Sequence, residues 1–347
     1  MAKKFLLYVS QDYSFAVLRP IQKAILARGD QCAWFVEGDE VTTAFFASFE
    51  RRLDDIKSVI DFNPDVVLVP GNVVPDFIPG LKVQVFHGLP SRKTKKNGQL
   101  YHYIIRGMFD LYCTQGPEST QKFNNLKRQY GYFEVAETGW SKLDPIFEAA
   151  SAESEQKQKS IFFASTFSPR FSKAEILYPL ITRMVKEHDF HWFITLHPKM
   201  NHETVERYHS LASDKVTLVQ PTEFTEYFKR ADMMLCDTSS IIYEFLTQIK
   251  PVVTFQTEKD EPCLVNVEQL NLLEKKILEV LQESHTNRKN ILESVSRFHP
   301  YRDGKSSERV LSAIDKMLAG ENLPAKKKPK NFLRNLKLRH KLGYWKI

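Results

Sequence analysis

The segment DMMLCDTSSIIYEFLTQIKPVVTF, residues 232–255, contains the pattern that decides the fold. Its apolar runs at 232–237 and 251–255 predict two short buried strands, and the stretch 239–248 between them predicts a helix. Two strands joined by such a helix form a right-handed βαβ unit, in which the strands are parallel. Near-continuous apolar runs are typical of parallel sheets that are covered on both faces. The segment therefore predicts an α/β fold.

The same alternation extends through both halves of the 347-residue chain. In the first half we expect strands at 5–10, 32–36, 65–70, 82–88 and 110–115, with helices at 15–28 and 118–129. In the second half we expect strands at 160–165, 191–197, 215–219, 232–237 and 251–255. Helices of the second half are expected at 173–187, 222–230, 239–248, 267–282, 288–297 and 306–318. The sequence thus predicts two doubly wound Rossmann-like domains.

The domain limits follow from two changes in composition. Residues 150–159 are polar and contain no large apolar side chain, so they predict a linker. The last 22 residues are strongly basic. We therefore expect an N-terminal domain at 1–150, a second domain at 151–320 and a basic tail at 321–347.

The formal net charge of +7 comes entirely from that tail. Nine of the 49 Lys and Arg residues and none of the 42 acidic residues lie between 326 and 347, which leaves the remainder with a net charge of −2. A pervasively basic nucleic-acid-binding domain is therefore disfavoured, and we expect no nucleic-acid partner. Basic residues interspersed with Leu, Phe and Trp instead favour the surface of an anionic membrane, although a solvated, disordered tail is the simpler alternative.

The cysteines and the apolar runs indicate the cellular compartment. The four cysteines are far apart and form no C-x-x-C pair, which is typical of a reducing compartment without disulfides or a zinc knuckle. The apolar run at 5–9 is too short for a signal peptide, and no run is long enough to span a membrane. We expect a cytoplasmic protein, peripheral on the inner face of the cell membrane.

Two histidines stand at the carboxyl ends of predicted strands, where ligands of doubly wound sheets bind. His87 precedes Gly88, and His197 precedes Pro198. An imidazole at such a position can accept a proton from an alcohol near neutral pH, although a structural histidine in a turn is about equally expected. Arg92 and Lys93 follow His87 in a cationic loop that could meet a phosphate group.

Two helix starts carry further polar groups. Thr238, Ser239 and Ser240 stand at a strand-to-helix switch, where hydroxyls and backbone N–H groups can bind phosphate or simply cap the helix. Near residue 304, a Gly turn precedes Ser306 and Ser307, one of which we expect to cap the last helix of the second domain. Neither G-x-G-x-x-G nor a P-loop occurs, which disfavours dinucleotide-dependent oxidoreductases and P-loop NTPases.

The histidines of the second half lack a familiar metal-ligand spacing. Five of them lie between residues 188 and 209 and would alternate between strand and helix. We therefore expect no metal site and no tightly bound cofactor, while a requirement for a divalent metal stays open.

Five short motifs occur in order: HGLP (87–90), TGWSKLD (138–144), LHPK (196–199), CDTSSIIYEF (236–245) and DGKSSERV (303–310). Together they resemble the CDP-glycerol glycerophosphotransferase family, which includes teichoic-acid primases and polymerases. The resemblance covers roughly residues 60–318. It implies a GT-B-like fold of two Rossmann-like domains with a cleft between them. The N-terminal domain would face the acceptor and the second domain would bind the nucleotide-linked donor.

The resemblance also implies an activity. Such an enzyme transfers glycerophosphate, or a related polyol phosphate, from a CDP-linked donor to a hydroxyl of a lipid-linked or membrane-associated glycan, and CMP leaves. His87 matches the proposed base, and His197 matches the histidine near the donor pyrophosphate. The expected donor or phosphate contacts are Thr238, Ser239, Ser240, Glu244, Asp303 and Gly304. Further expected acceptor or phosphate contacts are Gly88, Arg92, Lys93, Lys142 and Lys199.

Departures from the family pattern leave the donor and acceptor open. The chain has HGLPSRK where HGTPLKK is frequent, and Lys142 stands where Arg is usual. The alternatives are a GT-B glycosyltransferase that uses a nucleotide sugar, a UDP-N-acetylglucosamine 2-epimerase and a non-catalytic module that binds a lipid surface. An epimerase would favour several carboxylates at strand ends, whereas this sequence offers mainly histidines there.

Overall fold

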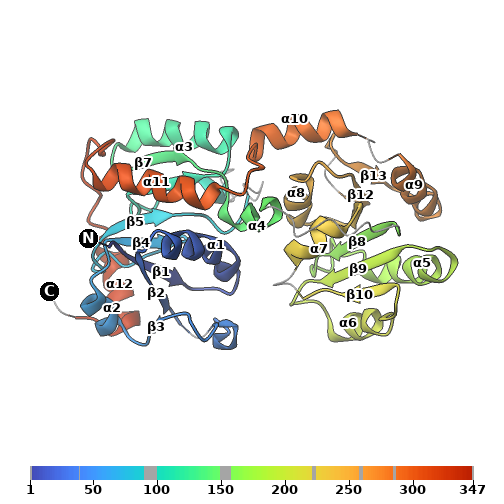
Figure 1. Cartoon of the computed structure of the whole chain (residues 1–347), viewed down its shortest axis with the longest axis horizontal. Coiled ribbons are helices and arrows are strands. Elements are labelled where there is room, and N and C mark those ends of the chain that lie inside the picture. Colours follow the sequence, from blue (N-terminus) through green and yellow to red (C-terminus); the bar gives the residue numbers. More distant parts are fainter. Residues whose placement is uncertain are drawn as a thin grey trace. The chain divides into compact units, whose positions relative to one another are not determined.

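The computed structural model describes residues 2–38, 40–89, 100–148, 158–220, 224–257, 261–283 and 287–345. The chain forms two compact α/β units (Figure 1). Unit 1 contains Met1–Asp144 and Asp303–Ile347, and unit 2 contains Pro145–Arg302. Each unit is built on its own parallel sheet.

Unit 1 alternates strands and helices along its first segment. Its strands are β1 (Lys4–Val9), β2 (Gln31–Val36), β3 (Arg52–Leu53), β4 (Val66–Val69), β5 (Leu81–Gln84), β6 (Leu111–Thr114) and β7 (Glu134–Glu137). Its helices are α1 (Tyr13–Ala27), α2 (Ile56–Phe62), α3 (Pro117–Tyr130), α11 (Ser306–Leu318) and α12 (Phe332–Leu342), with 3-10 turns η1 (Thr43–Phe45), η2 (Tyr101–Tyr103) and η3 (Ser141–Leu143). Helix α4 (Asp144–Phe147) lies at the junction of the two units.

Unit 2 repeats the same plan. Its strands are β8 (Ser160–Ser165), β9 (His191–Leu196), β10 (Val216–Leu218), β11 (Met233–Cys236), β12 (Val252–Phe255) and β13 (Val265–Val267). Its helices are α5 (Ala174–Glu187), α6 (His202–His209), α7 (Phe224–Arg230), α8 (Ile241–Leu246), α9 (Leu270–Gln282) and α10 (Arg288–Phe298).

Both sheets have the strand order of a Rossmann fold. The order is β3-β2-β1-β4-β5-β6-β7 in unit 1 and β10-β9-β8-β11-β12-β13 in unit 2, and the named strands pair in parallel. The order reverses between β1 and β4 and again between β8 and β11. Ligands of such sheets bind outside the carboxyl ends of the strands at this switch point. The fold expected from the sequence is thereby confirmed.

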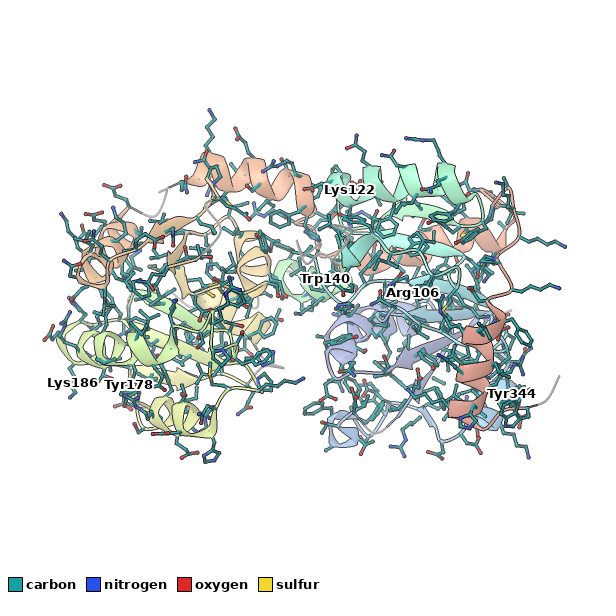
Figure 2. The ribbon with its side chains drawn as sticks, turned by 180° about the vertical axis from the view of Figure 1, so that it is seen from behind. Arg106, Lys122, Trp140, Tyr178, Lys186 and Tyr344 are labelled. Carbon is teal, nitrogen blue, oxygen red and sulfur yellow. The ribbon has the colours of Figure 1, made fainter. Side chains whose placement is uncertain are left out.

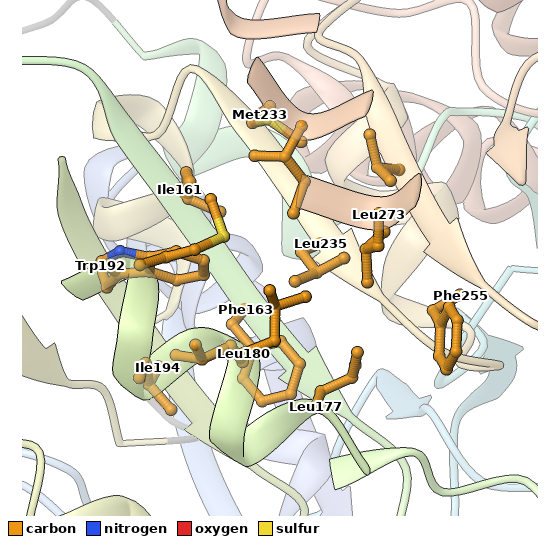
Figure 3. Close-up of a cluster of buried hydrophobic side chains, with 14 of the residues drawn as sticks. Ile161, Phe163, Leu177, Leu180, Trp192, Ile194, Met233, Leu235, Phe255 and Leu273 are labelled. Carbon is orange, nitrogen blue, oxygen red and sulfur yellow. The ribbon is translucent and has the colours of Figure 1, made fainter. Parts of the chain in front are cut away.

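Each sheet has its own apolar core. In unit 2, Phe163 and Leu235 of the central strands pack against Leu177 of α5 and Leu273 of α9 (Figure 3). These side chains have no exposed surface. Burial of a large aliphatic side chain contributes about 1.5–3 kcal/mol, so the apolar runs that mark the strands also stabilise the sheet.

Local signals set the helix ends. The Asp55 carboxylate accepts the Ser58 N–H at 2.7 Å and caps α2, and Asn63 ends this helix in the left-handed region at φ 49°. Helix α3 begins with Pro117 and ends at Gly131, whose φ of 76° favours glycine. Such signals explain why elements begin and end where the sequence analysis expects, within a few residues.

Strands were expected at ten positions, and the structure has a strand at each. The sequence analysis missed β3, β7 and β13, which are short or carry polar residues. It also missed α2, α4 and α6, assigned no helix to the residues of α12, and placed the start of α9 where β13 lies. Most of the expected linker, namely residues 150–157, lies outside the described residues.

The division between the units differs from the expected one. Helix α11 was assigned to the second domain, but it belongs to unit 1, where it packs against α1. Asp315 of α11 forms ion pairs with Lys3 at 2.7 Å and with Arg28 at 2.8 Å. The amphipathic pattern predicts the helix but not which of two similar sheets it covers, because both offer an apolar face.

The basic tail is part of unit 1 rather than a separate segment. Residues from 324 onward lead to α12, and Leu338 of this helix joins the apolar core of unit 1. No helix within the described ranges is both long enough and apolar enough to cross a membrane.

Candidate functional site

His87 lies three residues beyond β5, on the carboxyl side of the unit 1 sheet, and its side chain is exposed. Its Nδ1 atom is 3.3 Å from the carbonyl oxygen of Pro70, which follows β4. A carbonyl oxygen can only accept a hydrogen bond, so Nδ1 carries the proton in this contact. In the neutral ring Nε2 is therefore the nitrogen with the proton-accepting lone pair.

Phe86, the residue before His87, has a strained backbone. Its φ is 52°, which a bulky residue rarely adopts and which costs about 1–3 kcal/mol. Its carbonyl oxygen accepts the indole N–H of Trp140 at 3.1 Å, and Trp140 (Figure 2) is 1% exposed. The Phe86 ring stacks on His102 with centroids 4.7 Å apart. These contacts fix the direction in which the following His87 side chain leaves the sheet.

Two further contacts hold the segment around His87. The Gln115 side chain, just after β6, donates to the Gly88 carbonyl oxygen at 2.8 Å. Tyr13, at the start of α1, packs on the His87 ring with centroids 4.8 Å apart. A Cβ added at Gly88 would meet no atom of the described residues within 4 Å. The sequence analysis named neither Tyr13, Gln115 nor Trp140.

His102, which packs on Phe86, is expected to make the stability of the protein depend on pH. Its Nε2 atom is buried and has no hydrogen-bond partner among the described residues. Burial, with smaller effects from His87 and Lys122, lowers its pKa to about 3. Below about pH 6.5, His102 is protonated in the unfolded chain but not in the folded one. The free energy of unfolding therefore decreases as the pH is lowered from 6.5 to the pKa of the folded state.

We expect His102 to reduce the free energy of unfolding by about 1.4 kcal/mol for each pH unit below 6.5. Urea unfolding at pH 7, 6 and 5 would compare the wild type with His102→Phe, in which this dependence should vanish. His202→Phe is the control, because its side chain is 88% exposed, and it should keep the wild-type profile. Parallel profiles for wild type and His102→Phe would contradict the expectation.

His197 follows β9 in unit 2 and has the opposite hydrogen-bonding arrangement. Its Nδ1 atom accepts the backbone N–H of Lys199 at 3.0 Å, so in the neutral ring Nε2 carries the proton. Partial burial and the nearby Lys199 charge lower the pKa of His197 and favour this neutral form. Phe167, beyond β8, packs on the ring with centroids 4.3 Å apart. The exposed imidazole thus presents an N–H donor.

The segment after β11 lies at the switch point of the unit 2 sheet. The Asp237 carboxylate accepts the backbone N–H of Thr166 at 3.0 Å and that of Lys173 at 3.1 Å, and also the Ser165 hydroxyl. Burial raises its pKa, although these hydrogen bonds oppose the rise. Asp237 therefore ties the ends of β8 and β11 together, and the loop at 166–167 connects it with His197.

The hydroxyls that follow Asp237 are partly exposed at this edge. Thr238 Oγ1 is 3.2 Å from Thr257 Oγ1, and Ser239 Oγ accepts the Ile241 N–H at 3.5 Å. Ser240 precedes α8 without a side-chain cap. Glu244 is buried within α8. The structure thus brings His197 and the hydroxyl segment to the same edge of one sheet, but α8, with six residues, is shorter than expected.

Asp303 and Gly304 belong to unit 1, not to the donor-side domain in which they were expected. Gly304 has a φ of 66°, as a turn before α11 requires. Asp303 accepts the Lys305 N–H at 3.1 Å and pairs with Arg309. Lys142 lies over the Trp140 ring at 5.1 Å.

Asp144, which the sequence analysis did not select, joins two of the motifs. Its buried carboxylate accepts the N–H groups of Ser306 and Ser307 at 2.9 and 2.7 Å, and the Ser307 hydroxyl at 2.6 Å. Burial raises its pKa, while the bonds from Ser307 and Ser306 oppose the rise. The expectation that Ser306 or Ser307 caps α11 was wrong, since the residue before the helix forms no side-chain cap. The cap is instead the carboxylate of Asp144, which follows η3 and begins α4.

Among the described residues, one group of possible metal ligands lies elsewhere in unit 2. Ligand atoms of Glu187, His188 and Glu274 lie within 4.8 Å of one another. Arg183 pairs with both glutamates, and His188 Nε2 is 2.9 Å from Glu274. An arginine in contact with both carboxylates fits an ion-pair network better than a cation site.

Arg92 and Lys93 lie outside the described residues. The expected site residues that the structure describes fall into two sets. Unit 1 holds His87, Gly88, Lys142, Asp303 and Gly304, and unit 2 holds His197, Lys199, Thr238, Ser239, Ser240 and Glu244.

Comparison with known proteins gives one family and one fold. A family model described as UDP-N-acetylglucosamine 2-epimerase matches residues 129–315, which is more than half of the chain. No curated protein sequence matches the chain significantly.

Solved structures of two kinds are similar. A putative UDP-N-acetylglucosamine 2-epimerase from Listeria monocytogenes has a TM-score of 0.64 at 12% identity, covering 93% of this chain and 99% of that one. MnaA of S. aureus with UDP has a TM-score of 0.60 at 15% identity, covering 94% and 100%. The wall teichoic acid polymerase TagF soaked with CDPG has a TM-score of 0.62 at 13% identity, covering 92% and 89%. At these identities the likeness shows a shared GT-B-like fold.

Proposed function

The chain belongs to the UDP-N-acetylglucosamine 2-epimerase family, a family of enzymes, and from that premise we propose an enzyme that uses a nucleotide-activated substrate. Specifically, it moves glycerophosphate or a related polyol phosphate from a CDP-linked donor to a hydroxyl of a membrane-associated glycan. The similar structures include one obtained with UDP and one soaked with CDPG, which supports a nucleotide-linked donor.

The opposite tautomers of the two strand-end histidines carry the proposal. His87 presents Nε2 as a proton acceptor, because its Nδ1 donates to the Pro70 carbonyl oxygen. His197 presents Nε2 as a proton donor, because its Nδ1 accepts from the Lys199 N–H. A hydroxyl that becomes a nucleophile needs the first kind of group, and an anionic pyrophosphate needs the second.

The reaction balances with these two groups. The acceptor oxygen attacks the phosphorus that carries glycerol, and its proton passes to Nε2 of His87. A new P–O bond forms while the P–O bond to CMP breaks, and CMP leaves with the electron pair. The His197 N–H stabilises negative charge on the donor phosphates, as does a helix start with hydroxyls.

Unit 2 supplies the proposed donor contacts. Ser239, Ser240 and Thr238 offer hydroxyls at the edge where ligands of such sheets bind, and Lys199 adds a positive charge next to His197. In unit 1 we assign Gly88 and Lys142 to the acceptor or its phosphate. The roles expected for Arg92, Lys93, Glu244, Asp303 and Gly304 remain part of the proposal.

Epimerisation at carbon 2 of UDP-N-acetylglucosamine is the second candidate, because the family match favours it. Such chemistry benefits from carboxylates that exchange protons with the substrate. Two carboxylates that follow strands, those of Asp237 and Glu37, already have structural partners. Asp237 accepts three hydrogen bonds from its own unit. Glu37 accepts the Tyr8 hydroxyl at 2.6 Å and pairs with Lys341 at 2.7 Å. The histidines therefore favour transfer.

The test is the identity of the released nucleotide. The purified full-length protein is incubated with CDP-glycerol, CDP-ribitol, UDP-N-acetylglucosamine and a GDP-sugar, each with a membrane-extract acceptor. We expect CMP from a CDP-linked donor and no UDP. Release of UDP would establish a glycosyltransferase instead, and a change at carbon 2 of the UDP-sugar without nucleotide release would establish the epimerase.

We also propose that the enzyme works at the cytoplasmic face of the membrane, where a lipid-linked acceptor would be available. Recovery of activity in the membrane fraction of gently lysed cells, and its release by high salt, would test this placement.

A further inference from the structure

Helix α12 is apolar on two opposite sides. The inner side packs on unit 1, where Leu338 is 7% exposed and joins the apolar core. Leu342 packs against the same core. Asn335, also on this side, donates to the Asp76 carboxylate at 2.9 Å. These contacts account for the apolar and polar residues of one side only.

Contacts at both ends hold α12 in place. Before the helix, the Asn331 side chain donates to the carbonyl oxygens of Arg106 and Gly107 at 3.1 and 2.9 Å. After it, the Tyr344 ring stacks on Phe77 with centroids 4.6 Å apart. Figure 2 labels Arg106, whose carbonyl oxygen accepts the Asn331 side chain, and Tyr344. The outer side is therefore presented in a fixed orientation.

The outer side is formed by large apolar residues that unit 1 leaves uncovered. Phe332 and Leu333 are each 74% exposed, and Leu336 is 43% exposed. Trp345, just beyond the helix, is 55% exposed. Single exposed apolar residues are ordinary, but several together on one fixed helix mark an interaction surface.

Positive charge surrounds these residues. Lys327, Lys330 and Lys337 are exposed, and no acidic residue occurs from 326 to the C-terminus. Lys328 and Lys341 pair with Asp110 and Glu37 of unit 1 and so help to hold the tail in place. The exposed apolar residues are thus accompanied by lysines for which the described residues provide no ion pair.

We infer that this surface, formed by Phe332, Leu333, Leu336, Lys337 and Trp345, docks on an anionic lipid bilayer. Side chains of this kind enter the interface between headgroups and acyl chains, and each nearby lysine is attracted to anionic lipid. A second copy of the chain is a poorer occupant, because a two-fold contact would place the two cationic surfaces against each other.

The inference deepens the proposed function. It rests on that function only for the reason why the protein would dock, which is access to a lipid-linked acceptor. Binding to lipid itself does not require the transfer reaction. The two ideas can therefore fail separately: loss of vesicle binding with normal CMP release, or the reverse.

Vesicle co-sedimentation tests the surface. The full-length protein is mixed with vesicles of equal parts phosphatidylglycerol and phosphatidylcholine at 50 and 500 mM salt. We expect binding that weakens at the higher salt, and at least tenfold weaker binding of the double variant Phe332→Glu, Leu333→Glu. The matched control is Phe49→Glu, since Phe49 is also 74% exposed in unit 1, and it should bind like the wild type.

A second variant separates charge from apolar contact. Replacing Lys327, Lys330 and Lys337 with Gln should reduce binding to the anionic vesicles several-fold and weaken its salt dependence. Each variant is checked for folding by circular dichroism and for size by light scattering. Equal binding of wild type and the Phe332, Leu333 variant would overturn the inference, as would a wild-type dimer that this variant converts to a monomer without any vesicle binding.

Discussion

Replacing His87 with alanine is expected to lower kcat for CMP release from CDP-glycerol by about three orders of magnitude, because the acceptor hydroxyl loses its base. The KM for the donor should change by less than about threefold, since His87 is not among the proposed donor contacts. Steady-state kinetics with saturating acceptor, measured between pH 6 and 9, gives both constants. A residual rate that no longer depends on the ionisation of an imidazole completes the expected result.

Glutamine variants distinguish the two histidines more sharply than alanine does. A glutamine amide can donate a hydrogen bond but is not a base at neutral pH. His197→Gln should therefore recover part of the activity that His197→Ala loses, whereas His87→Gln should be as inactive as His87→Ala. His197→Ala should also raise the KM for the donor more than His87→Ala does.

The control is His202→Ala, whose exposed side chain in α6 takes no part in the proposed chemistry, and it should retain wild-type kinetics. Rescue by His87→Gln would show that His87 acts as a hydrogen-bond donor, which contradicts the tautomer that its contact with Pro70 requires. Wild-type activity in His87→Ala would contradict the transfer mechanism altogether.

The sequence predicted the fold well because its signals are local. A buried parallel strand such as Ile161 to Ser165 is nearly continuous in apolar residues, and turn residues bound it. Strand β7 lacks this local signal and was missed, since Glu134–Glu137 carries two glutamates and lies at the edge of the sheet. An edge strand is stabilised by one neighbour, here β6, and needs no continuous apolar run.

The sequence predicted where the candidate site residues lie relative to the strands but not how they are held. Strand ends could be counted, so the positions of His87 and His197 followed. The Trp140 indole that holds the Phe86 carbonyl oxygen comes from 54 residues away, and a positive φ at Phe86 has no sequence signal. The tautomers depend on single atoms, namely the Pro70 oxygen and the Lys199 nitrogen, which no pattern of residue types reveals.

The assignment of α11 illustrates the same limit. Its residues predicted a helix, and its serines suggested self-capping. The actual cap is Asp144, 162 residues from Ser306. Only the return of the chain from unit 2 to unit 1 brings these residues together. The TGWSKLD and DGKSSERV motifs thus share a structural role that neither one shows alone.

Replacing Asp144 with alanine is expected to destabilise unit 1 by about 3 kcal/mol. The change removes the cap of α11 and leaves two backbone N–H groups and the Ser307 hydroxyl without their acceptor in a buried position. Loss of a cap costs about 1 kcal/mol, and each buried donor left unsatisfied costs about 1–3 kcal/mol, of which relaxation recovers part. Thermal unfolding should show a loss of about 10 °C in Tm.

Two further variants test whether the loss of stability comes from the burial of the Asp144 carboxylate. Asp144→Asn keeps one acceptor oxygen and should lose less stability than Asp144→Ala. Asp55→Ala removes the carboxylate that caps α2 at the surface, where water can replace it, and should have a much smaller effect than Asp144→Ala. Because α11 covers α1 of the unit that holds His87, Asp144→Ala should retain its donor KM at 20 °C yet inactivate at a lower temperature. Equal losses of stability in the Asp144→Ala and Asp55→Ala variants would show that capping alone, and not the buried carboxylate, accounts for the contact.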